Sequence, residues 1–285
     1  MKTLLIGSNG QVGFELQRSL KGEVIALNSQ QLDLADTAAI RRTVSATKPN
    51  LIVNAAAYTA VDKAESEPEL TFAINATAPQ VLAEEAHKLN ALLVHYSTDY
   101  VFDGSKVGAY VETDPTNPQS VYGKSKLAGE QAIQAVGGHH LIFRTSWVYG
   151  TRGKNFLLTI LRLAQERDHL RVVADQIGAP TWCRSIAEAT ASAVSKWDAE
   201  KSGLYHLSCG GQTSWHGFAQ AILQKYPKPL KATADDVETI ATEQYPLPAK
   251  RPANSVLDNG KLQSVFYVGL PDWQQALLMT LDELA

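Results

Sequence analysis

The stretch that decides the fold lies near the start of the chain and reads Leu4-Leu5-Ile6-Gly7-Ser8-Asn9-Gly10-Gln11-Val12-Gly13. An apolar run ends at three glycines spaced three residues apart, and a helical pattern follows. In such a strand-turn-helix, one glycine makes the tight turn, one lets the backbone approach a pyrophosphate, and one lets helix and strand pack closely. The unpaired N–H groups of the helix then face the phosphates. We therefore expect Gly7, Gly10, Gln11, Val12 and Gly13 to bind a dinucleotide.

Short apolar runs alternate with longer helical patterns over the first 150 residues. The predicted strands are 3–6, 23–27, 51–55, 92–97 and 140–144, and the predicted helices are 11–20, 37–47, 69–89 and 125–136. Asn75 and Pro79 inside the third helix predict a kink or a late start. Repeated β-α alternation with nearly continuous apolar strands predicts a parallel sheet covered on both faces, which is a doubly wound, Rossmann-type α/β fold.

The pattern becomes less regular after residue 150. Helices are predicted at 155–166, 185–197 and 215–226, and strands at 171–173 and 203–207. Five prolines then interrupt regular structure between residues 227 and 256. We expect residues 1–150 to form a dinucleotide-binding domain and residues 151–285 to form mainly a smaller, C-terminal substrate-binding lobe, although the chain could cross back between the two.

The composition is that of an ordinary soluble globular protein. Hydrophobic residues make up 45% of the 285 and charged residues 19%, with a formal net charge of −3. This balance offers no general basic surface for nucleic acid, and no apolar run is long enough for a signal segment or a membrane span. Two cysteines, Cys183 and Cys209, are too few for a disulfide framework, and no histidine pair has the helical spacing of a zinc site. We expect a cytoplasmic protein with reduced thiols, without nucleic-acid or membrane partners.

The end of the second predicted strand bears on the choice of cofactor. At this place an NAD-selective site commonly has an acid that binds the adenine ribose, whereas this chain has Asn28. A neutral side chain does not repel a 2′-phosphate, so NADPH is at least as plausible as NADH, and both remain open. Asp33 and Leu34 could contact the adenine ring, or could belong to a surface loop.

A candidate acid–base pair lies in Tyr122-Gly123-Lys124-Ser125-Lys126. A tyrosine and a lysine four residues apart lie on one face of a helix. A nearby ammonium lowers the pKa of a phenol, which brings it closer to the range needed for proton transfer. The spacing is common by chance, but residues 54–58 and 95–100 end two other predicted strands with small and hydroxyl-bearing side chains. Ligands of open α/β sheets bind beyond the carboxyl ends of the strands, so these segments should meet in one crevice.

Taken together, these motifs resemble the extended short-chain dehydrogenase/reductase family and, within it, the dTDP-4-dehydrorhamnose reductases. The resemblance runs from Met1 to near the C-terminus. Besides the glycine turn and the Tyr122/Lys126 pair, it is carried by Asn54-Ala55-Ala56-Ala57-Tyr58-Thr59-Ala60-Val61-Asp62-Lys63-Ala64-Glu65, Ser97-Thr98-Asp99-Tyr100-Val101-Phe102-Asp103-Gly104, Arg144-Thr145-Ser146-Trp147-Val148-Tyr149, Asp175-Gln176-Ile177-Gly178-Ala179-Pro180-Thr181 and Arg251-Pro252-Ala253-Asn254-Ser255.

The resemblance implies a reaction and a set of catalytic roles. It implies that NAD(P)H reduces the 4-keto group of dTDP-6-deoxy-L-lyxo-4-hexulose to give dTDP-L-rhamnose, a precursor of cell-surface polysaccharide. Tyr122 would give the proton to the C4 oxygen. Lys126 would bind the nicotinamide ribose and lower the pKa of Tyr122, and Thr98 would orient the keto oxygen.

The resemblance also implies binding residues. Ala57, Tyr58 and Thr59 would lie beside the cofactor, and Tyr96 would touch its ribose or nicotinamide end. For the substrate, Asp99 is expected near a sugar hydroxyl unless it is only a turn residue, and Trp147 against the deoxysugar unless it is a core tryptophan. Arg251 is expected at the diphosphate, which a guanidinium can bind bidentately, unless it is exposed and unliganded.

Some members of the family are homodimers organised around Mg²⁺ with glutamate ligands. Glu15 and Glu283 lie at matching places, but the remaining position is Arg184. A cation opposite a divalent metal is unfavourable, so we doubt the Mg²⁺ and leave a homodimer open.

Two other functions stay open at this point. One is another nucleotide-sugar activity of the extended family, such as an epimerase or a dehydratase. A 4,6-dehydratase would need an acidic pair beside the tyrosine, whereas Thr98-Asp99 supplies one acid. The other is a non-catalytic, dinucleotide-binding regulatory subunit resembling the methionine adenosyltransferase β subunit. The presence of both Tyr122 and Lys126 favours an enzyme.

Overall fold

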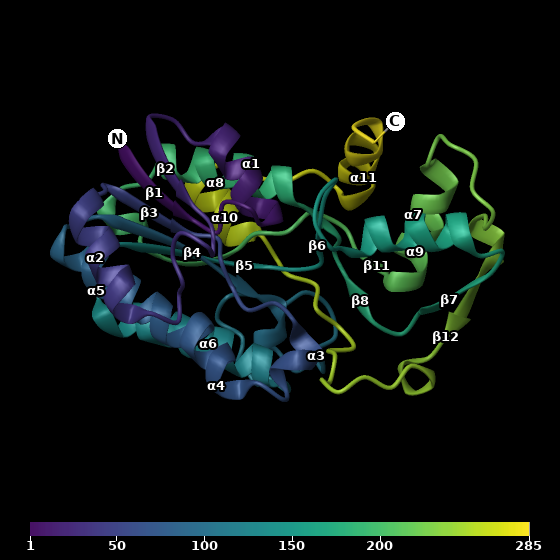
Figure 1. Ribbon diagram of the computed structural model, residues 1–285. Helices are drawn as coiled ribbons and strands as arrows, with labels where there is room; N and C mark the ends of the chain where they lie inside the picture. Colours follow the sequence, from purple (N-terminus) through teal and green to yellow (C-terminus); the bar gives the residue numbers. More distant parts are fainter. Residues whose placement is uncertain (285) are drawn as a thin grey trace.

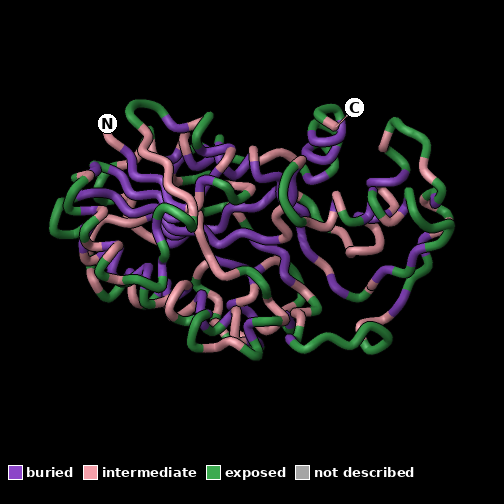
Figure 2. Tube along the Cα trace, in the orientation of Figure 1, coloured by how far each residue is buried: buried purple, intermediate pink, exposed green. Residues whose placement is uncertain are grey.

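The computed structural model describes residues 1–284 and is built around a six-stranded parallel sheet with the strand order β10-β5-β4-β3-β1-β2. The strands are β1 (Lys2–Ile6), β2 (Glu23–Leu27), β3 (Leu51–Asn54), β4 (Leu92–Thr98), β5 (His140–Thr145) and β10 (Gly203–His206). This sheet occupies the larger lobe on the left of Figure 1 and is its most deeply buried part (Figure 2). The predicted doubly wound α/β fold is confirmed.

Helices cover both faces of the sheet (Figure 1). One face carries α1 (Gln11–Ser19), α8 (Cys183–Ser195) and α10 (Gly260–Phe266), and the other carries α2 (Thr37–Thr47), α5 (Ala78–Lys88) and α6 (Val121–Val136). Along β4, Val94 packs into the first core and Leu93 into the second, because successive strand residues point to opposite faces. A strand buried on both sides reads as a continuous apolar run, which is why the sequence revealed it.

The chain forms its smaller lobe after β5 (right of Figure 1). The smaller lobe contains α7 (Phe156–Glu166), β7 (Leu170–Val173), α9 (Trp215–Lys225) and β12 (Val237–Ile240), with β7 and β12 paired in parallel. Between these elements the chain crosses back, so that α8 and β10 belong to the central sheet and its helical layer. The short pairs β6 (Val148–Tyr149) with β9 (Thr181–Trp182) and β8 (Ile177–Gly178) with β11 (Thr213–Ser214) lie at the crossings, and α11 (Trp273–Asp282) completes the described chain.

The predicted helix over 69–89 is interrupted in the structure. It consists of α4 (Pro68–Phe72), a π-helical turn over Ala73–Thr77 and then α5, preceded by the short α3 (Val61–Ala64). Pro79 explains the break because it has no N–H to donate to the carbonyl four residues earlier, at Asn75. The helix predicted at 125–136 begins earlier, at Val121, because the Ser120 hydroxyl caps it by accepting from the Gly123 N–H at 3.1 Å.

Two simpler observations complete the fold. Cys183 and Cys209 are buried free thiols. Within residues 1–284, none of the helices combines the length and the apolar character needed to cross a membrane.

Candidate active site

The glycine turn after β1 has the backbone geometry that the sequence predicted. Gly7 has a φ of +87°, which disfavours any side chain, and a Cβ there would lie 2.7 Å from the Ala56 nitrogen. A Cβ on Gly13 would collide with the Gly7 carbonyl. Gly10 occupies the N-cap of α1 without a side-chain cap, so N–H groups of the first turn are left for an anion. Gln11 accepts from the Asn155 amide at 2.9 Å, which ties this turn to the start of α7.

The segment after β2 is held by its own side chains. Asn28 Oδ1 accepts from the backbone N–H groups of Gln30 and Gln31, at 2.9 and 3.2 Å. Asp33 is exposed, while Leu34 is buried in the core between the sheet and α2. Of the Asp33–Leu34 pair, therefore, only Asp33 presents a side chain to solvent.

The loop after β3 is clamped by a residue that the sequence analysis did not assign to the site. Asn75 in the π-helical turn accepts from the Tyr58 N–H at 2.8 Å and donates to the Tyr58 carbonyl at 3.0 Å and the Ser125 hydroxyl at 3.0 Å. These bonds fix the Ala57–Thr59 backbone against α6. The phenol of Tyr58 donates to Glu67 at 2.6 Å. The only available signal was an asparagine shortly before Pro79 in a helical pattern.

Tyr122 and Lys126 lie on the first two turns of α6, next to the end of β4. The Lys126 side chain is almost fully buried; its Nζ donates to the Tyr96 carbonyl at 2.6 Å and lies 3.1 Å from His95 Nε2. Tyr96 thus offers its carbonyl oxygen on this side, whereas its phenol bonds to Thr190 of α8 at 2.8 Å on the opposite face of the sheet.

The hydroxyl of Thr98 bonds to the side chain of Asp99 and to the backbone of Tyr100. It donates to Asp99 Oδ1 at 2.9 Å and accepts from the Tyr100 N–H at 3.1 Å. Burial raises the pKa of Asp99 to about 6, opposed by hydrogen bonding from Ser255 and Thr98. Burial also raises the pKa of Tyr122 to about 12, opposed by a hydrogen bond with Thr98.

These values correct one expectation from the sequence. Lys126 was expected to lower the pKa of Tyr122, but burial of the phenol dominates, and Lys126 is directed to Tyr96 and His95. Burial in turn lowers the pKa of Lys126 to about 8. The phenol therefore stays protonated near neutral pH, which is the form that a proton donor requires.

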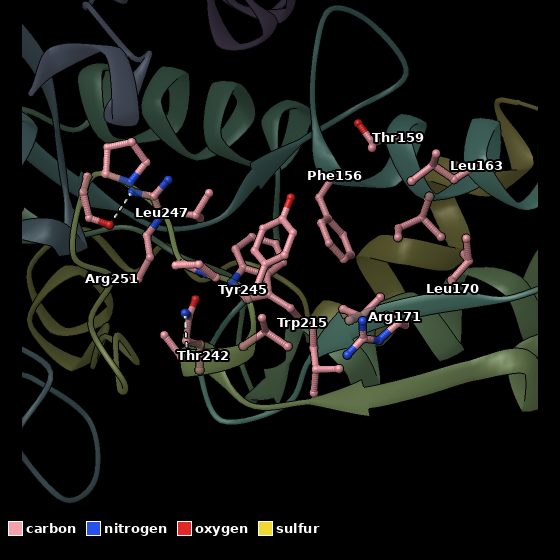
Figure 3. Close-up of a pocket in the computed structure, with 18 of the residues that line it drawn as sticks. Phe156, Thr159, Leu163, Leu170, Arg171, Trp215, Thr242, Tyr245, Leu247 and Arg251 are labelled. Atoms are coloured by element: carbon pink, nitrogen blue, oxygen red, sulfur yellow. Dashed lines mark hydrogen bonds between the residues drawn. The ribbon is translucent and has the colours of Figure 1, made fainter. Parts of the chain in front are cut away.

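A cavity of about 700 Å³ opens beside these residues (Figure 3). It lies between α7, α9 and β7 of the smaller lobe and the segment 242–251. Phe156, Trp215 and Tyr245 supply aromatic walls, and Arg251 lies at one end (Figure 3). Tyr100 also lines the cavity, and its ring meets that of Tyr122 edge-on at 5.6 Å between centroids. The cavity is therefore separated from Tyr122 by the Tyr100 ring.

Two residues predicted to bind substrate lie near this cavity: Arg251 lines it, and Trp147 packs against Trp215 in its wall. Trp147 has a φ of +46° and stacks on Trp215, with ring centroids 3.5 Å apart and planes 5° apart. Such a left-handed backbone is uncommon for a bulky residue and is typical of functional sites. Arg251 donates to Asp62 at 2.8 Å and lies over the Tyr100 ring, 5.9 Å from its centroid.

The comparisons with known proteins agree with this geometry. A family model described as RmlD substrate binding domain matches residues 1–285. A dTDP-4-dehydrorhamnose reductase of Burkholderia thailandensis is 49% identical, with 100% of this chain and 99% of the relative covered. The chain belongs to this reductase family.

Solved structures of dTDP-4-dehydrorhamnose reductases superimpose closely. The one from Clostridium acetobutylicum gives a TM-score of 0.93 at 39% identity, covering 100% of this chain and 99% of the other. The one from Bacillus anthracis, in complex with NADP, gives 0.92 at 34% identity and covers 99% of both chains. A Thermus thermophilus UDP-glucose 4-epimerase gives 0.83 at 21% identity, over 99% of this chain and 98% of the other, which shows the shared fold alone. The expectation of a reductase is confirmed.

The residues at the metal position of the reductase family do not fit a divalent cation. The guanidinium of Arg184 on α8 lies between the carboxylates of Glu15 and Glu283; its Nε donates to Glu15 at 3.0 Å, and its Nη1 donates to Glu283. A positive group already neutralises the two acids there. Elsewhere in residues 1–284, no cluster of three or more His, Cys, Asp or Glu could hold a metal.

Sequence reasoning also missed a layer of buried polar side chains beneath α6. Lys126 of the candidate site belongs to this layer. His95 meets Lys126 and Asn54, and Glu130 makes a two-pronged ion pair with Arg144 at 2.9 and 2.6 Å. The signal in the sequence was polar residues inside apolar strand runs, at Asn54, His95 and Arg144.

Proposed function

We propose that this chain is an NADPH-dependent reductase that converts dTDP-4-dehydro-L-rhamnose to dTDP-L-rhamnose, for rhamnose and polysaccharide biosynthesis. The observation that carries the proposal is Tyr122, whose desolvated phenol keeps its proton and whose ring packs against Tyr100 in the wall of a cavity of about 700 Å³. The membership in a family of reductases supports the same reaction.

The dinucleotide fits the larger lobe. Gly7 and Gly13 leave no room for side chains, and the uncapped first turn of α1 offers N–H groups to a pyrophosphate. Asn28 brings no negative charge to the adenine-ribose position, so it tolerates the 2′-phosphate of NADPH. The NADP in the complex of the Bacillus anthracis relative favours the same choice over NADH.

The sugar nucleotide fits the cavity of the smaller lobe, so that residues 1–150 bind mainly the cofactor and residues 151–285 mainly the substrate. Phe156 and Trp215 offer aromatic faces to a base. Arg251 would exchange its bond to Asp62 for the diphosphate. Asp99, bonded to Thr98, and Trp147, stacked on Trp215 of the cavity wall, would contact the sugar. A reaction between NADPH and a nucleotide sugar is expected in the cytoplasm.

The residues of this chain have the following tasks in the reaction. Bound NADPH supplies the hydride for C4. Thr98 holds the keto oxygen and the Tyr122 hydroxyl in one hydrogen-bonded group, and Tyr122 gives its proton to that oxygen. Lys126, buried one turn further along α6, would bind the nicotinamide ribose with its Nζ.

The test is a Tyr122→Phe variant, assayed by the loss of reduced-nicotinamide absorbance with the dTDP-4-keto sugar. The variant keeps the ring but has no proton to give, so turnover should fall by roughly 10²–10⁴-fold while cofactor binding persists. Tyr205→Phe is the matched control, because the Tyr205 hydroxyl donates to the Lys201 carbonyl away from the site. Normal turnover in Tyr122→Phe would reject the assignment of Tyr122 as the acid.

A further inference from the structure

One side chain, Asn155, ties the start of α7 to the glycine turn. The two N–H groups of its amide are shared among Gln11 Oε1 at 2.9 Å, the Gly150 carbonyl at 2.9 Å and the Arg152 carbonyl at 3.1 Å. Its Oδ1 accepts from the Leu158 N–H at 3.1 Å and so caps α7. Both ends of the amide are therefore bonded, and the reaction described above assigns no task to Asn155.

On one side of this tie, Gln11 stands where the pyrophosphate of the cofactor is expected. It is the first residue of α1 after the N-cap Gly10, so its backbone N–H belongs to the first turn that is left for an anion. Its side chain meanwhile reaches Asn155. The loop before α7 also follows α1 at a second point, because the Arg152 guanidinium lies 3.5 Å from the centroid of the Phe14 ring.

On the other side, the residues after Asn155 form part of the cavity wall. Phe156 and Thr159 both line the cavity (Figure 3). The Phe156 ring lies 4.6 Å from that of Trp215 between centroids. The hydroxyl and the N–H of Thr159 donate to the Asn155 carbonyl at 2.8 and 3.1 Å. A shift of Asn155 would therefore shift the first turn of α7 and the wall that it forms.

We propose that Asn155 is a positioning residue that couples the two ligand sites. Binding of the cofactor's pyrophosphate fixes Gln11, and Asn155 passes this order to the first turn of α7 and so to the cavity wall. The inference rests on the proposed function, in which these two sites hold NADPH and a dTDP-linked sugar. Coupling is a free energy that acts equally in both directions, so NADPH and the nucleoside diphosphate should each tighten binding of the other by the same factor.

A second tie between cofactor and substrate segments acts differently. Asp62 of α3 accepts from Arg251 at 2.8 Å and from the Ala249 N–H at 3.2 Å. In the proposed function Arg251 leaves Asp62 for the diphosphate, so this ion pair opposes substrate binding. The bond between Gln11 and Asn155 needs no such exchange, because Asn155 does not itself line the cavity. It can persist with both ligands bound, as positive coupling requires.

Calorimetric titration with dTDP, with and without saturating NADPH, measures the coupling. dTDP lacks the sugar that would meet the nicotinamide, so a change in its affinity does not come from direct contact between the ligands. We expect NADPH to lower the Kd of dTDP for the unaltered protein by roughly 5-fold or more. An unaltered protein that binds both ligands without coupling would refute the inference.

Two variants test whether the coupling runs through Asn155. Gln11→Met keeps the length of the side chain and the backbone N–H but removes the acceptor for Asn155, so the coupling factor should fall toward 1. Asn155→Asp still caps α7 but has no N–H to donate, so the factor should fall there too. Because Asn155→Asp also removes the bonds to Gly150 and Arg152, Gln11→Met is the more selective of the two.

Gln17→Met is the matched control. Gln17 is another amide of α1, and it donates to the carbonyls of Ser8 and Gly13 in the larger lobe instead of reaching α7. This variant should keep the coupling factor of the unaltered protein. An unchanged factor in Gln11→Met, or an equal loss in Gln17→Met, would overturn the proposal.

Hydrogen exchange of the unaltered protein gives a readout that depends on no variant. NADPH should slow exchange of the Leu158 and Thr159 amides, which bond to Asn155. No change there would contradict the proposal. If neither NADPH nor dTDP binds, the proposed function fails; if both bind without coupling, the inference alone fails. If the coupling is found but Tyr122→Phe retains turnover, the assignment of the acid fails and the inference stands.

Discussion

Burial shifts the pKa of three neighbouring groups at the active site, and each shift favours the uncharged form. The pKa of Tyr122 is raised to about 12, that of Asp99 is raised to about 6, and that of Lys126 is lowered to about 8. Desolvation is the first cause in every case, as expected where β4, α6 and the turn after β4 pack together and shield these groups from water. Near neutral pH Tyr122 is therefore fully protonated, while the pKa values of Asp99 and Lys126 lie close to the pH.

The shift of Asp99 predicts a pH-dependent stability. Because its folded-state pKa is raised from 3.8 to about 6, the folded protein holds a proton that the unfolded chain releases. The contribution of Asp99 is therefore fully present below pH 4 and is lost as the pH rises through 6, by about 3 kcal/mol in all. We expect Asp99→Asn, which cannot ionise, to gain stability relative to the unaltered protein by this amount between pH 4 and pH 7. Urea unfolding of both proteins at each pH measures the difference; a difference that is constant with pH would contradict it.

At the scale of elements, local patterns predicted the strands of the larger lobe to within two residues, because a doubly buried parallel strand is a short apolar run bounded by turns. The predicted bounds of β2 and α2 are those of the structure. The π-helical turn at Ala73–Thr77 was not predictable beyond a kink, because it depends on Pro79 and on the packing of α6. The partners of Tyr58 and Lys126 were missed for the same reason: Asn75 and His95 come from other elements, and hydrogen bonds between elements leave no periodic signal.

The contact between α6 and the π-helical turn predicts a sensitive glycine. A Cβ on Gly129 would collide with the Asn75 carbonyl, which Pro79 leaves without its helical donor. Gly129→Ala should therefore lower the free energy of unfolding by about 1–3 kcal/mol, although alanine is the better helix former. Because Asn75 also clamps Tyr58, cofactor affinity should fall as well. Gln131→Ala, exposed on the same helix, is the control and should be nearly neutral in urea unfolding. Equal stability of the two variants would show that the helices move apart without cost.

At the scale of the whole molecule, the crossings of the chain bring the two lobes together around the site. The helix at 183–195 and the strand at 203–206 have the same local patterns as their neighbours in the smaller lobe. The strand nevertheless pairs with β5 in the central sheet, and the helix packs on that sheet, because strand pairing rather than periodicity decides which sheet a strand enters. This arrangement places Gln11 of the glycine turn against Asn155 at the start of α7, and Asp62 against Arg251 at the cavity. Segments far apart in the sequence therefore meet at the glycine turn and at the cavity, which no local pattern could indicate.

Arg184 joins three distant parts of the chain and predicts that stability is independent of metal. Its guanidinium bonds to Glu15 on α1 and to Glu283 beyond the end of α11, and Glu15 is nearly buried. Arg184→Ala leaves the Glu15 carboxylate with only Arg18, at 3.5 Å. The free energy of unfolding should therefore fall by about 1–3 kcal/mol, which is less than for a fully buried pair because Arg184 is partly exposed.

For the unaltered protein, millimolar Mg²⁺ or EDTA should leave the melting temperature unchanged, since the guanidinium already supplies the positive charge. Arg162→Ala, which breaks the exposed pair with Glu166, is the control and should cost less than about 1 kcal/mol. A melting temperature that rises with Mg²⁺ and falls with EDTA would mean that the guanidinium moves aside for a cation.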